Sequence, residues 1–140
     1  MADIYTRVTE LEEQVAELTE QITGLTPNDS GWLPLTLLNG VIAYGNDINV
    51  PRYRKIGNTV YLTGAVKNIT ARATVIATLP EGFRPVNGYP FVQNTSHENN
   101  IAQFIRWNIT SSGDITMAYD SATDISADDW FPIATSFIID

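Results

Sequence analysis

A heptad pattern at the start of this 140-residue chain constrains its fold more than any other feature. Apolar residues recur at alternating steps of three and four: Met1, Ile4, Val8, Leu11, Val15, Leu18, Ile22 and Leu25. A stripe this narrow cannot be buried within one helix, so it needs the stripes of other helices. The pattern predicts an oligomeric coiled coil at residues 1–26, and the remainder of the chain is then a head carried in several copies.

Local signals mark both ends of the predicted helix. Asp3 is a suitable N-cap, because its carboxylate can accept hydrogen bonds from the first free backbone amides. Gly24 and then Pro27 are stop signals, so we expect the helix to end at about Gly24–Leu25. At about 1.5 Å per residue, the helix is a rod about 33 Å long.

Two features of the seam bear on the number of helices. Valine or isoleucine at most a positions, with leucine at most d positions, favours two strands. By contrast, Arg7, Val8, Leu11 and Glu12 resemble the known trimerisation signature of short coiled coils. In that signature, the arginine packs over the core and pairs with the glutamate of a neighbouring helix. We predict a homotrimer on this resemblance, with a dimer as the alternative.

The charge of the chain is concentrated in the predicted stalk. Residues 1–29 hold seven acidic residues and one arginine, a net charge of −6, which leaves −2 of the total of −8 for residues 30–140. An acidic stalk under a nearly neutral head argues against binding to nucleic acid, which requires a basic surface. It also argues against an anionic membrane surface.

Several other classes are excluded by composition. The chain has no cysteine, so disulfides and thiolate metal sites are absent. The N-terminus has neither the basic region nor the apolar region of a signal peptide. No apolar run approaches the length of a membrane span, so we expect no membrane insertion.

From Trp32 onward the pattern changes from helical to β. Residues 27–31 have the composition of a turn-rich linker, and short alternating runs separated by Gly, Asn, Pro and Asp follow over 32–140. The clearest hairpin joins 52–56 to 59–66 through Gly57-Asn58. About eight antiparallel strands are expected, with 101–109 central, and this indicates a β-sandwich or jelly-roll head.

Four segments of the head, taken in order, resemble a known family: 32–40, 53–64, 79–85 and 130–140. Similar segments occur in the C-terminal head domains of tail and baseplate appendage proteins, receptor-binding or fibre, of phages that infect Gram-positive bacteria. The resemblance implies that the 53–64 hairpin and the 79–85 loop are structural. It also implies that Phe83 plugs the core and that Arg84 braces the loop.

The same resemblance implies a function. It implies a homotrimer on the virion, made in the host cytoplasm, that adheres to a host-surface saccharide or wall polymer. It implies no enzymatic activity and contact of the stalk with other virion proteins. The ligand residues of this family differ between members, so candidates must come from the chemistry of the side chains, and the faces between heads are the first place to expect a ligand.

We single out six residues as candidates for ligand contact: His97, Glu98, Trp107, Tyr119, Asp129 and Trp130. The polar stretch 93–100 is expected to be a loop whose amides, hydroxyls and imidazole suit sugar hydroxyls, and the alternative is an exposed loop between strands without a ligand. Trp130 offers a flat face for a sugar ring, with core packing as the alternative for it and for Trp107.

Catalytic and metal sites are not predicted. The single histidine has no nucleophile elbow near it, and the acidic residues around 120–129 lack the spacing of a calcium loop. Paired carboxylates would suit glycoside hydrolysis, but nothing in the sequence places two of them across a cleft. We therefore expect no metal, no cofactor and no catalytic residue, and read these residues as a solvated loop.

The strand 52–56 carries Arg52, Arg54 and Lys55 around one tyrosine. Such a strand is suited to phosphate on a wall polymer, but we favour a charged sheet edge that prevents aggregation. The resulting prediction is a phage appendage that presents heads for host attachment. The alternatives are a structural fibre or decoration protein without a ligand, and a trimeric polysaccharide depolymerase.

Overall fold

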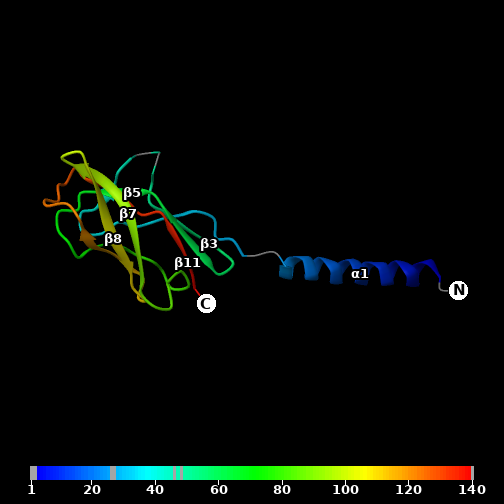
Figure 1. Ribbon diagram of the computed structural model, residues 1–140. Coiled ribbons are helices and arrows are strands. Elements are labelled where there is room, and N and C mark those ends of the chain that lie inside the picture. The colour runs from blue at the N-terminus through cyan, green and yellow to red at the C-terminus, as the bar shows by residue number, and fades with distance from the viewer. Residues whose placement is uncertain (1–2, 26–27, 46, 48, 140) are drawn as a thin grey trace.

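The chain forms one helix that leads into a β head (Figure 1). The computed structural model describes residues 3–25, 28–45, 47 and 49–139, and the side chains of Leu25 and His97 lie outside what it describes. Helix α1 (Ile4–Leu25) ends where the stop signals predict. The predicted N-cap is confirmed, because the Thr6 backbone N–H donates to Asp3 Oδ1 at 2.9 Å.

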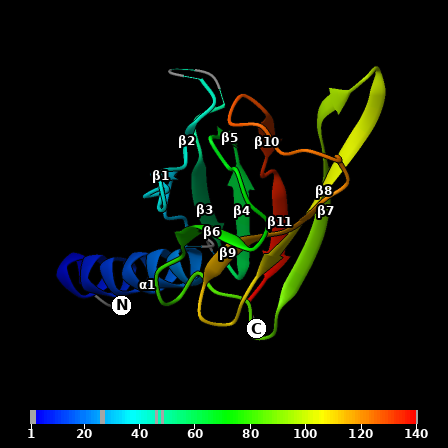
Figure 2. The same ribbon diagram turned by 90° about the vertical axis from the view of Figure 1, so that its left-hand side faces the viewer.

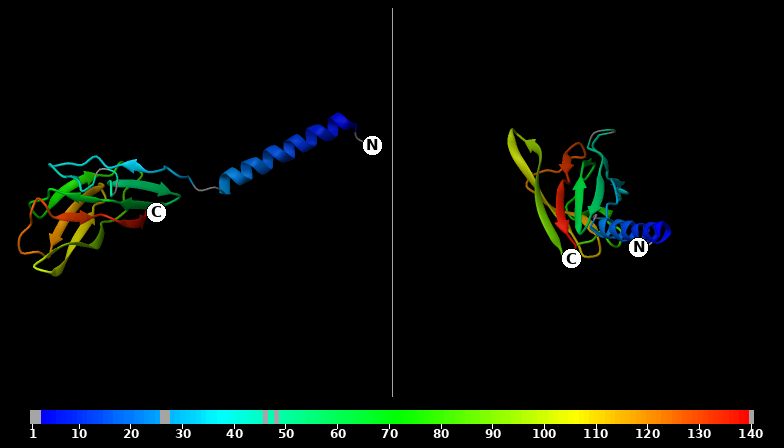
Figure 3. Two further views of the ribbon diagram at one scale, coloured as in Figure 1. Left: turned by 90° about the horizontal axis from the view of Figure 1, so that it is seen from above. Right: turned by 90° about the vertical axis from the view of Figure 1, so that its right-hand side faces the viewer.

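Helix α1 extends away from the head (Figures 1 and 3). In the single chain, every seam residue whose side chain is described is exposed: Ile4, Val8, Leu11, Val15, Leu18 and Ile22. No helix in the described part of the chain is long and apolar enough to cross a membrane.

The head contains eleven strands within the described residues: β1 (Leu33–Pro34), β2 (Ile42–Ala43), β3 (Arg52–Ile56), β4 (Thr59–Thr63), β5 (Ala65–Lys67), β6 (Thr74–Thr78), β7 (Tyr89–Glu98), β8 (Ile101–Ile109), β9 (Asp114–Asp120), β10 (Trp130–Pro132) and β11 (Thr135–Ile138). We expected about eight. The count differs because four strands have only two or three residues and because single runs are broken into two.

The strands form a sandwich, as predicted (Figure 2). The orders are β1-β3-β4-β11 in sheet A, β10-β5-β2 in sheet B and β6-β9-β8-β7 in sheet C. Sheets A and B form one bent layer, because β4 continues into β5 and β10 continues into β11 at the same point. Ile133 N–H donates to Gly64 O at 3.0 Å between these two breaks.

Gly64 makes the break between β4 and β5. Its φ of 116° lies in the region that side chains rarely adopt, and a Cβ there would lie 2.6 Å from Pro51 Cα. The run 59–66, which the sequence presents as one strand, therefore changes sheet after the five residues of β4.

The core lies between sheet C and the bent layer. Strand β8 is central in sheet C, as predicted, with β7 and β9 on either side. Its inward residues alternate with exposed ones, and the largest buried side chains of the core are Trp107 and Phe131. The loop at 79–85 is also as expected: Phe83 packs edge-on against Tyr53 with ring centroids 5.0 Å apart, and Arg84 Nε donates to Leu79 O at 2.8 Å.

The polar stretch 93–100 is not a loop, in contrast to the prediction. Strand β7 continues to Glu98 and joins β8 through a two-residue turn at Asn99-Asn100. Both asparagines have positive φ, 51° and 64°, which matches the right-handed twist of a hairpin. Asparagine tolerates this backbone region, so the same polar residues that suggested a loop instead form the tip of a long hairpin.

The segment before the head is held against sheet A. Ser30 N–H donates to Lys55 O at 2.9 Å, and Gly57 N–H donates to Asn28 O at 2.8 Å. Arg54 forms an ion pair with Asp29 and donates from Nε to Asp29 Oδ1 at 2.9 Å. Strand β3 therefore lies between β4 and residues 29–34, and our expectation of a free charged edge was wrong.

The contact between Asp29 and Arg54 should be visible in a pH titration. The Arg54 hydrogen bond lowers the pKa of the Asp29 carboxyl from 3.8 to about 2. Because the folded-state pKa is depressed, the contact favours the fold fully above pH 3.8 and is lost as the pH falls through about 2. A carboxyl NMR titration should report this value, and Arg54→Gln should return the pKa towards 3.8.

Arg52→Gln is the matched control for that titration. Arg52 lies in the same strand and, like Arg54, over the Trp32 ring, 5.4 Å from its centroid, whereas Asp29 pairs with Arg54. This variant should leave the low pKa of Asp29 in place. An unchanged pKa in Arg54→Gln would contradict the assignment.

Candidate functional site

The end of the head farthest from α1 is built by the tip of the β7–β8 hairpin and by the loop at 121–129 (yellow and orange in Figures 1 and 3). Four predicted candidates lie in or beside these segments: His97 and Glu98 on β7, Asp129 in the loop, and Trp130 at the start of β10. Of His97, only its place on β7 is described. The hairpin and the loop therefore bring together residues that are about thirty positions apart in sequence.

Two other candidates lie elsewhere. Trp107 is fully buried, and its Nε1–H donates to Pro132 O at 2.8 Å. Its ring also stacks on Phe91 within the core, so it is not available to a ligand, and the core alternative holds. Tyr119 is exposed on the outer face of sheet C, where it contacts Phe104 and Arg72.

Trp130 separates two hollows on the surface of the head. The first, about 370 Å³, is lined by Tyr44, Asn49, Thr63, Gly64, Ala65, Trp130, Pro132 and Ala134. The second, about 450 Å³, is lined by Asn94, Thr95, Asn100, Ala102, Gln103 and Trp130. We call these two hollows the Trp130 groove. The indole is half-buried, and its ring centroid lies 6.0 Å from that of Tyr44.

The backbone around Trp130 is well anchored. Thr95 Oγ1 donates to Trp130 O, and Trp130 pairs with Lys67 across β10 and β5. Asn94 and Asn100 line the second hollow together with Trp130, and each amide can both donate and accept hydrogen bonds. A flat aromatic face beside amides is chemically suited to a neutral, hydroxyl-rich ligand.

The sequence missed Tyr44. Nothing marks it beyond its place before the turn residues Gly45-Asn46-Asp47, and only the pairing of β2 with β5 brings it to Trp130. The amides of Asn94 and Asn100 were predictable, because the stretch 93–100 was singled out for its amides.

An acidic hollow of about 220 Å³ lies beside the groove, lined by Ser96, Glu98, Asp120, Ala122, Asp124, Ser126 and Asp129. Its carboxylates hold the loop to the hairpin. Glu98 Oε2 accepts from Thr123 N–H at 3.0 Å, and Asp129 accepts from Ser96 Oγ at 3.1 Å and from Ser126 N–H at 2.8 Å. Glu98 and Asp129 therefore shape the end of the head by fixing the loop.

Asp120 is buried at the floor of this hollow. Its Oδ1 accepts from Ala122 N–H at 2.6 Å, and burial raises the pKa of its carboxyl above the ordinary value. Among the described residues, no three histidine, cysteine or acidic side chains are placed to hold a metal ion.

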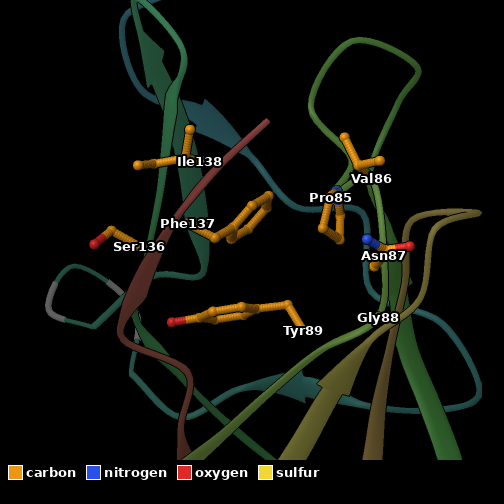
Figure 4. A pocket seen from close by; sticks show the side chains of 8 residues that line it. All are labelled: Pro85, Val86, Asn87, Gly88, Tyr89, Ser136, Phe137 and Ile138. Atoms are coloured by element: carbon orange, nitrogen blue, oxygen red, sulfur yellow. The ribbon is translucent and has the colours of Figure 1, made fainter. Parts of the chain in front are cut away.

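A further hollow, about 610 Å³, lies between β11 and the chain leading into β7 (Figure 4). Its lining residues are Pro85, Val86, Asn87, Gly88, Tyr89, Ser136, Phe137 and Ile138. Tyr89 forms its floor, and a column of rings runs from Phe137 through Tyr89 and Phe91 to Trp107. The sequence did not indicate this hollow.

The fold of this chain is similar to the folds of two solved phage receptor-binding proteins. The receptor binding protein gp15 of Listeria phage PSA is similar over 97% of this chain and 80% of its own, with a TM-score of 0.61 and 19% identity. The head domain of lactococcal phage bIL170 is similar over 77% of this chain and 96% of its own, with a TM-score of 0.52 and 18% identity.

The family is also shown by sequence. The model of the YomR C-terminal beta sandwich domain matches residues 26–133, and the chain belongs to this family. Among curated proteins, no match was found.

Proposed function

We propose that this protein is a phage appendage on the virion surface that displays its heads in three copies for attachment to a host-surface saccharide. The observation that carries the proposal is the Trp130 groove at the head, where a half-buried indole lies between a tyrosine and a set of amides. The family and the fold of the solved phage heads support the same reading.

The stalk supplies the multiplicity in this proposal. Its seam residues are exposed in the single chain, and three-fold display multiplies a weak affinity of one head. We propose that the stalk contacts other virion proteins. The heads, at the opposite end of the chain, are then free to face the host.

Binding without hydrolysis is part of the proposal. The carboxylates nearest the groove accept hydrogen bonds from the loop that they anchor, which suits a structural role. Release of reducing sugar ends from a host polysaccharide, lost in Asp129→Asn, would instead favour a depolymerase.

Trp130→Ala should lower binding to a cell-wall polysaccharide about tenfold, because one aromatic contact contributes about 1.4 kcal/mol. The measurement is titration of the full chain against wall polysaccharides of Gram-positive bacteria on an array, followed by calorimetry with those that bind. Trp32→Ala is the matched control, since Trp32 is also partly exposed but lies next to the linker.

Absence of binding to every polysaccharide at high protein concentration would contradict the attachment function and favour a structural fibre or decoration protein. Equal losses in the two tryptophan variants would move the site away from the Trp130 groove.

A further inference from the structure

The outer face of sheet C carries exposed aromatic and basic side chains together. Val92, Phe104 and Tyr119 are 57%, 44% and 46% exposed, and Arg106 is exposed among them. The strand register makes Arg106 the direct neighbour of Val92 on β7 and of Tyr119 on β9. Arg72 completes the set from the turn before β6. We call these five residues the sheet C patch.

Arg72 is held in place by the backbone and by an aromatic ring. Its Nη2 donates to Asp120 O and to Ala122 O, both at 2.9 Å, and its guanidinium lies 5.3 Å from the centroid of the Tyr119 ring. These contacts fix the group, and its positive charge also interacts with the nearby Asp120 carboxyl. Within the described residues, the ion pair formed is that of Arg54 with Asp29, so neither Arg72 nor Arg106 is paired with a carboxylate.

Two of the three basic residues that the sequence offered for phosphate are engaged elsewhere, while Arg52 lies over the Trp32 ring. Arg54 is paired with Asp29, and Lys55 Nζ donates to Gly82 O at 2.8 Å while lying over the Phe83 ring. The better candidate site for an anion is therefore not β3 but the opposite layer, where Arg72 and Arg106 flank Tyr119.

We propose that the sheet C patch binds a phosphate-bearing polymer chain. The guanidinium groups supply charge-assisted hydrogen bonds to phosphate oxygens, and the exposed rings between and beside them pack against the apolar part of each repeat. The whole chain carries a net charge of −8, so general attraction does not draw a polyanion to it. Binding then depends on the local pair of arginines.

The patch borders the Trp130 groove at one point, because Phe104 pairs with Asn94 across β8 and β7, but its two arginines line neither hollow of the groove. Trp130 lies on the layer that faces the inner side of sheet C, whereas the patch lies on the outer side. A head with both sites would contact neutral and charged units of one wall polymer. Each site is tested with its own probe, so failure of one leaves the other standing.

The experiment titrates the full chain with poly(glycerol phosphate) oligomers and, in parallel, with uncharged polyglycerol of the same length. We expect binding of the phosphate polymer only, weakening as salt is raised. Arg106→Gln should lower affinity about tenfold, and Arg72→Gln with Arg106→Gln should lower it further. Arg52→Gln is the matched control, because it removes the same charge from sheet A.

Three outcomes overturn the proposal: no binding of the phosphate polymer by the native chain, an equal loss in Arg52→Gln, or a change in assembly mass in the Arg106→Gln variant. The last would mean that the patch is an interface between copies. Arg72 also bonds two loop carbonyls, so Arg106→Gln, which disturbs no such contact, decides the result if the double variant does not fold.

Discussion

Two aspartates in the seam of α1, Leu11→Asp with Leu18→Asp, should convert the proposed trimer to single chains. Both leucines occupy d positions of the heptad and are 59% and 58% exposed in the single chain. A carboxylate at such a position cannot be buried between helices without a large desolvation cost. Light scattering should then report a mass near 15.5 kDa. Attachment to a surface-bound polysaccharide should weaken by about 10²–10⁴, because avidity is lost.

The control places the same two charges outside the seam. Ala16→Asp with Thr23→Asp adds two aspartates at b positions, which face solvent in a coiled coil. This variant should keep the mass of the native protein. If the seam variant also keeps it, the heads associate by themselves and the heptads serve another purpose, such as docking on the virion.

Gly64→Ala should lower the free energy of unfolding by about 3 kcal/mol or more. The added Cβ would meet the Pro51 backbone at 2.6 Å, and the φ of 116° is strained for any side chain. The clash is with backbone, so no side chain can move to relieve it. The change acts where β4 passes into β5, so it should also disturb the first hollow of the Trp130 groove. Chemical denaturation followed by tryptophan fluorescence measures the effect.

Gly31→Ala separates the cost of a positive φ from the cost of the clash with the Pro51 backbone. Gly31 also has a positive φ, 67°, but a Cβ there would meet nothing within 4 Å. This variant should cost only about 1 kcal/mol, the strain of the left-handed conformation. Equal losses in both variants would show that backbone strain alone matters and that the close approach to Pro51 does not.

The parts of the fold that were predictable depend on short-range signals. The period of the seam and the cap at Asp3 define α1, because helix hydrogen bonds join residues four apart. The β3–β4 hairpin was predictable because Gly57 takes a positive φ of 59° in a two-residue turn. The alternation along β8 correctly indicated a central strand.

The predictions that failed concern strand pairing that the local composition does not show. The polar stretch before Asn99-Asn100 was read as a loop, because nothing local shows that β8 pairs with it. Strand β3 was read as a free edge, because the sequence does not show that Asp29 turns back onto Arg54. In each case the local composition was compatible with two structures, and a contact across 25 residues or fewer selected one.

The Trp130 groove was likewise predictable in its chemistry but not in its placement. That Trp130 and the amides of β7 suit a sugar follows from their chemistry, and the sequence supports that much. Trp107 has the same chemistry, yet it is buried while Trp130 lines a groove, because β8 presents Trp107 on its inward face and β10 starts at the rim of the sandwich.

By itself, then, the sequence determined an exposed helical seam, a cysteine-free β head and the chemical types of its polar residues. Only the tertiary structure decided which aromatic rings face solvent, which arginines lack a carboxylate partner and which strands end together. The physical reason is that exposure and pairing depend on sheet order, and sheet order is set by packing between segments that no local pattern connects.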